Sequence, residues 1–264
     1  MSELVITTIE NGVADVRLNR PEKHNGLSTA MFEEITAAGE ALKSDKSVRA
    51  VVLSGNGPSF CSGLDVGGAS MNPASVAEKM KAIAGSPANF FQKPAWVWKE
   101  LEVPVIAAIH GATFGGGLQI ALGADIRIAH PETKLSVMEV QLGLIPDMTA
   151  SATLRELLPL DVAKELALTG KKISGVEAAE LGLVTRVADD PLAEATALAK
   201  EIASRNPDAT RGIKVMFDAN WYCSTQEALA REAELQMKII GSKNHMEAMA
   251  ARFQKRDAKF DDRK

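Results

Sequence analysis

The stretch His110-Gly-Ala-Thr-Phe-Gly-Gly-Gly-Leu-Gln-Ile-Ala-Leu-Gly-Ala-Asp125 follows an apolar run, Val105 to Ile109, that is typical of a buried strand. Its three consecutive glycines, Gly115 to Gly117, precede a helical pattern of apolar residues. They leave backbone N–H groups unshielded at a helix N-terminus, where an anion or a developing oxyanion is stabilised. Tight strand-to-helix packing is the alternative. The stretch is neither a dinucleotide fingerprint nor a phosphate loop, because no glycine follows three residues after Gly117 and no Gly-Lys-Ser/Thr occurs.

On either side of this stretch, strand-like runs alternate with helical segments, which predicts an α/β core with largely parallel strands. Asn11-Gly12 separates two apolar-alternating runs and predicts a β-hairpin. From Asp161 onward the pattern is mostly helical, so we expect a core at 1–195 and a helical C-terminal region at 196–264. The predicted strands are Leu4 to Ile9, Val13 to Leu18, Val48 to Leu53, Val105 to Ile109, Ile126 to Ala129 and Val184 to Val187.

The composition limits the class of protein. With 46% hydrophobic and 24% charged residues in 264, the chain is globular, not disordered, collagen-like or a disulfide scaffold. A net charge of -4 gives no basic field for nucleic acid or an acidic membrane. The uncharged stretch Val103 to Ala124 suits a strand, turn and helix start better than a membrane span, because it contains Pro104, His110, Gln119 and several glycines. Two cysteines, no zinc-spaced cluster and an acidic Met1 to Glu10 predict a cytoplasmic protein without a secretory signal or a metal.

A second glycine-bearing turn, Phe60-Cys-Ser-Gly-Leu-Asp65, comes shortly after the predicted strand Val48 to Leu53. In a parallel α/β core this turn and the triple-glycine turn both lie at the carboxyl ends of strands, where ligands bind. Two backbone N–H donors, one from each turn, could meet on one carbonyl oxygen and form an oxyanion hole.

A third segment, Ser136 to Asp147, places Glu139 in an apolar setting and a second carboxylate, Asp147, eight residues later. Two carboxylates beside an apolar pocket can act as proton donor and acceptor, because desolvation and mutual repulsion separate their pKa values. The alternative is that Asp147 caps a helix beginning at Thr149 and that Glu139 pairs with an arginine.

These three segments, in this order, resemble the crotonase (enoyl-CoA hydratase/isomerase) superfamily. The resemblance covers nearly the whole chain, and its pieces are highly specific only in combination. They are Leu18 to Leu27, Phe60 to Val66, Ile106 to Ala129, Leu168 to Ser174 and Ala178 to Val187.

The resemblance implies a core of repeated ββα units and a helical C-terminal region that trimerises, often as a dimer of trimers. It implies an acyl-CoA thioester as the substrate and no separate cofactor. The thioester oxygen would be held by the N–H groups of Leu64 and Gly116. The further substrate-binding positions are Lys23, His24, Ser62, Asp65, Gly115 and Gln119; for Lys23 and His24 a solvated loop is the alternative.

The reaction is predicted from three positions. Hydratases of the superfamily use two glutamates, and Gln119 stands at the first position, where an amide cannot exchange protons near neutral pH. Glu139 alone resembles the monoenoyl isomerases, and its spacing to Asp147 resembles the dienoyl-CoA isomerases, which have an aspartate at the position of Gln119. The dehalogenase branch is disfavoured, because it has tryptophan at the position of Glu139 and its base at that of Gln92.

We therefore expect double-bond isomerisation, with Glu139 and Asp147 moving a proton and Gln119 orienting the substrate or a water. The alternatives are a hydratase with glutamine in place of one glutamate, a non-catalytic acyl-CoA binding protein, and a structural homo-oligomer. Two further expectations concern packing. The aromatic residues Phe90, Phe91, Trp96 and Trp98 either line the acyl pocket or pack a surface helix, and Cys61 is a small buried residue.

Overall fold

A computed structural model describes residues 3–65 and 73–263, so Val66, the last residue of the segment Phe60 to Val66 that carries the resemblance, lies outside the described residues. The main sheet has six strands in the order β1-β2-β3-β4-β6-β9. β1 and β2 form the predicted hairpin, closed by Asn11 and Gly12 at φ 51° and 80°, and the other neighbouring strands are parallel. The strands are β1 (Val5–Glu10), β2 (Val13–Leu18), β3 (Ala50–Gly55), β4 (Val105–Ile109), β6 (Ile126–Ala129) and β9 (Arg186–Val187).

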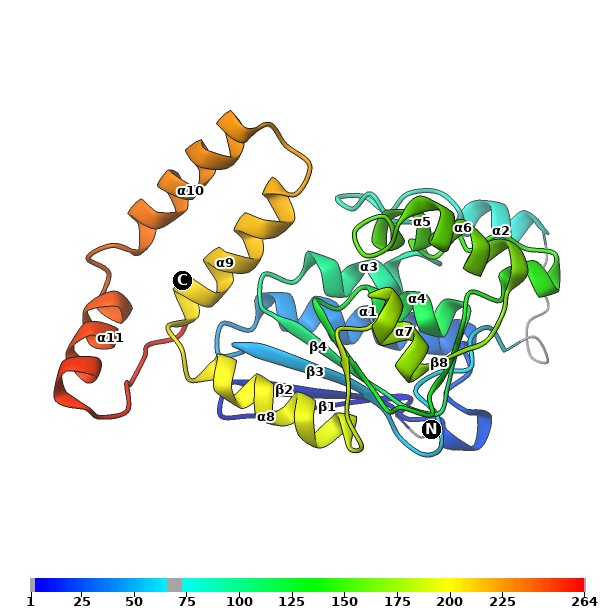
Figure 1. Cartoon of the computed structure of the whole chain (residues 1–264), viewed down its shortest axis with the longest axis horizontal. Coiled ribbons are helices and arrows are strands. Elements are labelled where there is room, and N and C mark those ends of the chain that lie inside the picture. The colour runs from blue at the N-terminus through cyan, green and yellow to red at the C-terminus, as the bar shows by residue number, and fades with distance from the viewer. Residues whose placement is uncertain (1–2, 66–72, 264) are drawn as a thin grey trace.

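Helices cover both faces of this sheet (Figure 1). Along β3, Val51 and Leu53 face one core, to which α1 (Thr29–Ser44), α3 (Lys93–Glu100) and α4 (Gly116–Leu122) contribute buried residues. Ala50 and Val52 face the other core, which is closed by α8 (Pro191–Ala203). Successive side chains of a strand point to opposite faces, so a strand covered on both faces reads as the unbroken apolar run seen in the sequence.

A second sheet of three strands, β5 (Ala112–Phe114), β7 (Lys134–Ser136) and β8 (Ile173–Ser174), carries the chain from the main sheet to the predicted glycine turn. The corner between β4 and β5 is at Gly111, whose φ is 60°. A Cβ there would lie 1.9 Å from the carbonyl oxygen of Pro58, so this close approach requires glycine. The shorter helices are α2 (Pro73–Lys79), α5 (Ala150–Leu154), α6 (Leu160–Thr169) and α7 (Gly175–Leu181), with 3-10 turns η1 (Pro21–Lys23) and η2 (Glu139–Leu142).

The C-terminal helices project away from this core (Figure 1). They are α9 (Pro207–Asn220), α10 (Thr225–Ile239) and α11 (Lys243–Gln254). The expected boundary at residue 195 falls inside α8, and α8 packs on the main sheet through Ala195, Ala199 and Ala203, so the projecting region begins after α8. The ammonium group of Lys214 joins α9 to the core by donating to Asp125 Oδ2 at 2.8 Å and to the carbonyl oxygen of Val103 at 3.1 Å.

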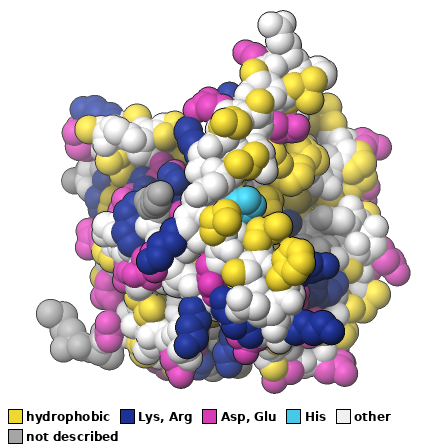
Figure 2. Space-filling model, turned by 90° about the vertical axis from the view of Figure 1, so that its left-hand side faces the viewer, with side chains coloured by type: hydrophobic (Ala, Val, Ile, Leu, Met, Phe, Trp, Pro, Cys, Tyr) yellow, Lys and Arg dark blue, Asp and Glu magenta, His cyan; other side chains and the backbone are white. Residues whose placement is uncertain are grey.

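Large apolar side chains are exposed on this projecting region. Figure 2 views the molecule from this side and shows hydrophobic side chains gathered on the face. The expected trimer or dimer of trimers would cover such a face, and it stays a prediction. None of the helices within 3–65 and 73–263 is long and apolar enough to cross a membrane. The exposed residues include Ile213, Phe217, Trp221, Leu229, Met237, Ile240, Met246, Met249 and Phe253.

Candidate active site

The second predicted turn lies between the segment at Leu27 and strand β5, which leads to the triple-glycine turn. Leu27 N donates to the carbonyl oxygen of Gly63 at 2.8 Å, and Asp65 N donates to that of Leu27 at 3.1 Å. The C=O of Gly63 and the N–H of Leu64 belong to one trans peptide and point in opposite directions, so the N–H of Leu64 points away from Leu27. On that other side lies β5, because Cys61 N donates to Ala112 O at 3.2 Å.

Glycines allow the second turn to reach the start of α4. A Cβ on Gly63, whose φ is 86°, would lie 2.7 Å from Phe114 O and 3.7 Å from the backbone nitrogen of Gly116. A Cβ on Gly117 would lie 2.3 Å from Cys61 O. Packing and function are therefore not alternatives here, because the close packing is what brings the two turns together. Within the described residues, neither Leu64 N nor Gly116 N donates a hydrogen bond, and both residues line one cavity.

Glu139 begins η2, three residues after the end of β7, and only 9% of it is exposed. Its Oε1 accepts a hydrogen bond of 2.6 Å from Nε2 of Gln119. Its Oε2 is buried and has no partner among the described residues. The predicted alternative, a structural ion pair with an arginine, is therefore wrong: the partner of Glu139 is a neutral amide.

Asp147 lies in the wall of the same cavity. The prediction that it could cap the next helix is wrong, because Thr149 takes the N-cap position of α5, with a left-handed φ of 85° and no cap hydrogen bond from its own side chain. Burial raises the pKa of Asp147. Burial also raises the pKa of Glu139, and the charge of Asp147 adds to this, although the hydrogen bond from Gln119 opposes it.

The cavity that holds these groups has a volume of about 680 Å³. Phe91 lines it and packs edge to face against Phe32, with ring centroids 5.7 Å apart. Trp98, by contrast, is fully buried in the main core, so the two predicted roles of the aromatic residues are divided among them. The apolar residues that line the 680 Å³ cavity are Leu64, Phe32, Val76, Met80, Phe91, Met138, Leu142, Leu144, Ile145 and Met148.

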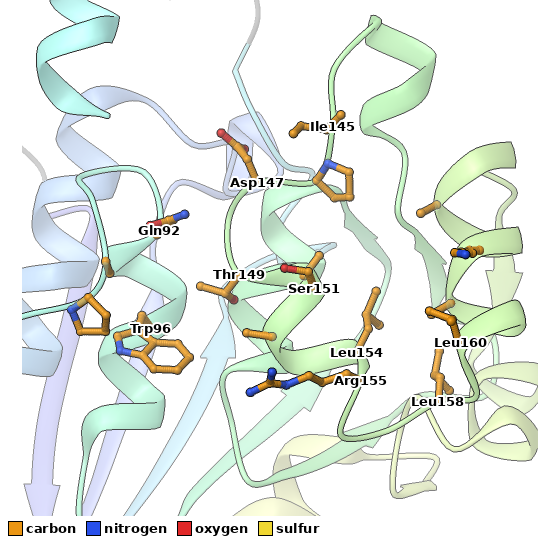
Figure 3. Close-up of a pocket in the computed structure, with 18 residues that line it drawn as sticks. Gln92, Trp96, Ile145, Asp147, Thr149, Ser151, Leu154, Arg155, Leu158 and Leu160 are labelled. Atoms are coloured by element: carbon orange, nitrogen blue, oxygen red, sulfur yellow. The ribbon is translucent and has the colours of Figure 1, made fainter. Parts of the chain in front are cut away.

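A second cavity of about 840 Å³ adjoins the first, and Ile145 and Asp147 line both. Figure 3 shows Gln92 and Trp96 of the α3 segment on one side of it and the α5 and α6 segments on the other. Asp147 lies toward one end and Arg155 toward the opposite end (Figure 3). Most of its wall is thus formed by helices, whereas the first cavity also contains the two glycine-bearing turns.

The residues expected to bind coenzyme A are grouped on the loop around η1 and the Cys61 turn. Lys23 and His24 are exposed, and His24 Nδ1 lies 2.9 Å from Ser59 Oγ. Ser62 lines the 680 Å³ cavity. Asp65 instead forms an ion pair of 2.7 Å with Arg20.

Two residues that hold the loop around η1 against the Cys61 turn were not predicted. Arg20 joins the loop to the turn by donating to Asp65 Oδ2 and to Gly26 O. Asn25 is fully buried, and its Nδ2 donates to Ser59 O and Phe60 O at 2.8 and 3.1 Å. Asn25-Gly26 is a turn dipeptide, the one available signal, but nothing local to it identifies those acceptors.

Cys61 is buried, as expected. Its Sγ donates to Asn25 O at 3.0 Å, and burial raises the pKa of the thiol to about 12. A thiol in that state is not a nucleophile near neutral pH. Its place in the site is therefore as a packing residue beneath Gly117.

The model of the family described as Enoyl-CoA hydratase/isomerase matches residues 8–263. This chain belongs to the enoyl-CoA hydratase/isomerase family. It also has the fold of the crystal structure of an enoyl-CoA hydratase from Bacillus anthracis, with a TM-score of 0.89 and 30% identity over 97% of this chain and 98% of that one. The crotonase-like α/β fold expected from the resemblance is confirmed.

Relatives within the family differ in reaction. The mitochondrial Delta(3,5)-Delta(2,4)-dienoyl-CoA isomerase of Mus musculus is 32% identical, covering 96% of this chain and 80% of that protein. The short-chain-enoyl-CoA hydratase of Clostridium acetobutylicum is also 32% identical, covering 96% of this chain and 95% of that one. Overall identity therefore does not distinguish isomerase from hydratase for this chain.

Proposed function

We propose that this enzyme shifts a double bond along the acyl chain of an acyl-CoA thioester. Glu139 and Asp147 would transfer the proton, and the N–H groups of Leu64 and Gly116 would hold the thioester oxygen. One observation carries the proposal: the two carboxylates line the cavity of the two unengaged amides, while the position beside Glu139 is taken by Gln119. An amide neither gives nor takes a proton near neutral pH, so Asp147 is the second proton carrier.

The reaction would proceed through an enolate. Oε2 of Glu139 takes a proton from a carbon of the acyl chain, that C–H bond breaks, and its electron pair delocalises onto the thioester oxygen. The amide N–H groups stabilise this charge as it develops. Protonated Asp147 then forms a new C–H bond at a more distant carbon, which moves the double bond and leaves Glu139 protonated and Asp147 ionised.

The electrostatics of the two carboxylates favour this division of roles. Burial raises the pKa of Glu139, but the hydrogen bond from Gln119 opposes this rise and supports the ionised form, which a base needs. Burial raises the pKa of Asp147, which increases its protonated fraction, as an acid needs. After each turnover the proton returns from Glu139 to Asp147 through solvent, so no resident cofactor takes part.

The remaining expectations complete the proposal. Lys23, His24 and Ser62 would contact the coenzyme A portion at the entrance, with Gly115 and Asp65 shaping the two turns that receive the thioester. The C-terminal helices would bury their exposed apolar face in a homotrimer or a dimer of trimers. A cytoplasmic location is part of the same proposal.

An ultraviolet assay with purified protein tests the reaction. A 3,5-dienoyl-CoA and a 2-enoyl-CoA would be offered separately to the wild type and to the Glu139→Gln and Asp147→Asn variants. Glu132→Gln, a substitution of an exposed carboxylate, is the matched control. The expected result is isomerisation of the diene that falls sharply in both site variants and is unchanged in the control.

Two other outcomes would overturn the proposal in different directions. Hydration of the 2-enoyl thioester that survives Asp147→Asn would favour a hydratase, the activity for which the Clostridium relative is named. Tight binding of both thioesters without turnover would favour a non-catalytic acyl-CoA binding protein.

A further inference from the structure

The side chain of Gln119 connects Glu139 to the start of α5. Its Oε1 accepts a hydrogen bond of 3.0 Å from Ala150 N, and its Nε2 donates to Glu139 Oε1 at 2.6 Å. Only 1% of Gln119 is exposed. Because a backbone N–H can only donate, the amide oxygen must face Ala150, and the NH₂ group must therefore face Glu139.

The start of α5 needs this acceptor. The first N–H groups of a helix have no partner within the helix, and a side chain at the N-cap usually supplies one. Thr149, at the N-cap of α5, is in the left-handed region and makes no such bond. Gln119, from α4, supplies the acceptor instead, so both ends of its amide are engaged and its orientation is determined.

This orientation determines which oxygen of Glu139 is available. Oε1 is taken by the Gln119 amide, and it also lies against the backbone of Gly115, where an added Cβ would be 3.1 Å away. Oε2 is left buried without a partner among the described residues. A buried carboxylate oxygen without a donor is costly, and it is typical of an atom that meets the substrate.

We propose that Gln119 is a positioning residue that links the α5 N-terminus to Glu139, directs Oε2 of Glu139 at the substrate and restricts the site to isomerisation. A carboxylate at this position would share a proton with Glu139 and supply the second acid of a hydration site, which the amide cannot do. The restriction to isomerisation rests on the proposed function, whereas the link itself rests only on the two hydrogen bonds.

The proposal predicts a shift in titration. Asp147, which lines the same cavity, is the charged group that acts on Glu139, and the backbone of Gly115 lies against its Oε1. Removing the Gln119 donor removes an interaction that favours the ionised carboxylate. The pKa of Glu139 should therefore rise, and the acidic limb of the pH profile of kcat/KM should move to higher pH.

Two variants and one control test this. Gln119→Met retains the length of the side chain without a donor or acceptor, and Gln119→Glu retains the acceptor for Ala150 N. Ser174→Ala removes an N-terminal helix cap on α7, outside the site. The measurements are the pH profile of kcat/KM for both thioesters, thermal unfolding, and a ¹³C NMR titration of glutamate-labelled protein, in which Glu139→Gln assigns the Glu139 signal.

For Gln119→Met we expect an acidic limb at higher pH and a kcat lower by about 10²-fold, with KM little changed, because a misplaced base affects the chemical step. For Gln119→Glu we expect a two-step titration and an increase in hydration relative to isomerisation. A Gln119→Met variant that loses stability like Ser174→Ala while the Glu139 titration stays in place would overturn the proposal, since Gln119 would then be only a helix cap.

The outcome for the link is separable from that for the reaction. If the wild type turns over neither thioester, the proposed function fails, and the NMR titration still decides whether Gln119 controls Glu139. If the wild type isomerises the diene but Gln119→Glu gains no hydration, the restriction to isomerisation is wrong while the proposed function stands.

Discussion

The two adjoining cavities share Ile145 and Asp147 but differ in how they are built and in what they offer. In the 680 Å³ cavity, turns far apart in the sequence bring two unengaged amides and two carboxylates together. The 840 Å³ cavity lies between helices, and two cationic side chains, Arg155 and Lys164, are part of its lining. Close backbone approach therefore gives the first cavity its chemistry, and helix packing gives the second its volume.

The largest effect should come from the first cavity. Glu139→Gln removes the base, and we expect kcat/KM for isomerisation to fall roughly 10³-fold, since a positioned general base contributes about 10²- to 10⁴-fold. Steady-state kinetics with the diene substrate measures this. A loss of the same size in the Glu132→Gln control would show that the effect is not specific to the site.

The close contact between the second turn and α4 can be disrupted without changing either carboxylate. An alanine at 117 would put its Cβ 2.3 Å from Cys61 O, so Gly117→Ala must push the second turn away from α4. Because losing one oxyanion donor costs about 10²- to 10³-fold in kcat, we expect a loss in that range. Gly212→Ala, in α9, is the matched control, since the nearest atom to its added Cβ is a flexible Ile239 side-chain carbon at 3.3 Å. Equal losses in both variants would argue against the oxyanion hole.

Asp147, in the wall that the two cavities share, has a different role from Glu139 in the proposed reaction. Asp147→Asn should lower isomerisation about 10²-fold, because the acid that completes the shift is lost. It should still exchange an acyl-chain proton with D₂O, because Glu139 and the two amides remain. Mass spectrometry of the recovered thioester measures the exchange. Exchange that is lost in Asp147→Asn and kept in Glu139→Gln would reverse the assigned roles.

Sequence patterns predicted the parts of the fold whose cause is local. Strands buried on both faces read as apolar runs, and the glycine turns marked close approach, so β3, β4 and both turns were predictable. The expected boundary at residue 195 falls inside α8, because nothing in the composition of that helix marks the alanines that pack on the sheet.

The interactions that define the site join residues far apart in the chain. Gln119 and Ala150 are 31 residues apart, and Arg20 and Asp65 are 45 apart. Nothing in the residues near Gln119 indicates that its amide would complete a helix start on another element. The left-handed conformation of Thr149, whose own side chain does not cap that helix, likewise falls on a residue other than the glycine or asparagine that a turn pattern would signal.

The ionised carboxylate of Glu139 should also lower the free energy of unfolding of the protein at neutral pH. Its pKa is raised in the folded protein, so the folded state binds the proton more tightly than the unfolded state does. The free energy of unfolding therefore decreases as pH rises from the ordinary carboxyl pKa, about 4.3, through the raised value. Glu139→Gln should raise Tm by a few degrees at neutral pH and change it little near pH 4. A calorimetric gain that is the same at both pH values would contradict this electrostatic cause.

The second cavity should give the smallest effect, and one that depends on the substrate. Ser151 lies on α5 in its wall (Figure 3), and Ser151→Phe would fill part of its volume. An acyl chain short enough to end in the first cavity should be turned over as before. A chain that reaches past Ile145 should bind less well, with KM raised about 10-fold, because a few methylene groups lose their apolar contacts. Turnover of a series of chain lengths measures this. A loss shared equally by all chain lengths would mean that the second cavity supports the geometry of Asp147 and does not hold the end of the acyl group.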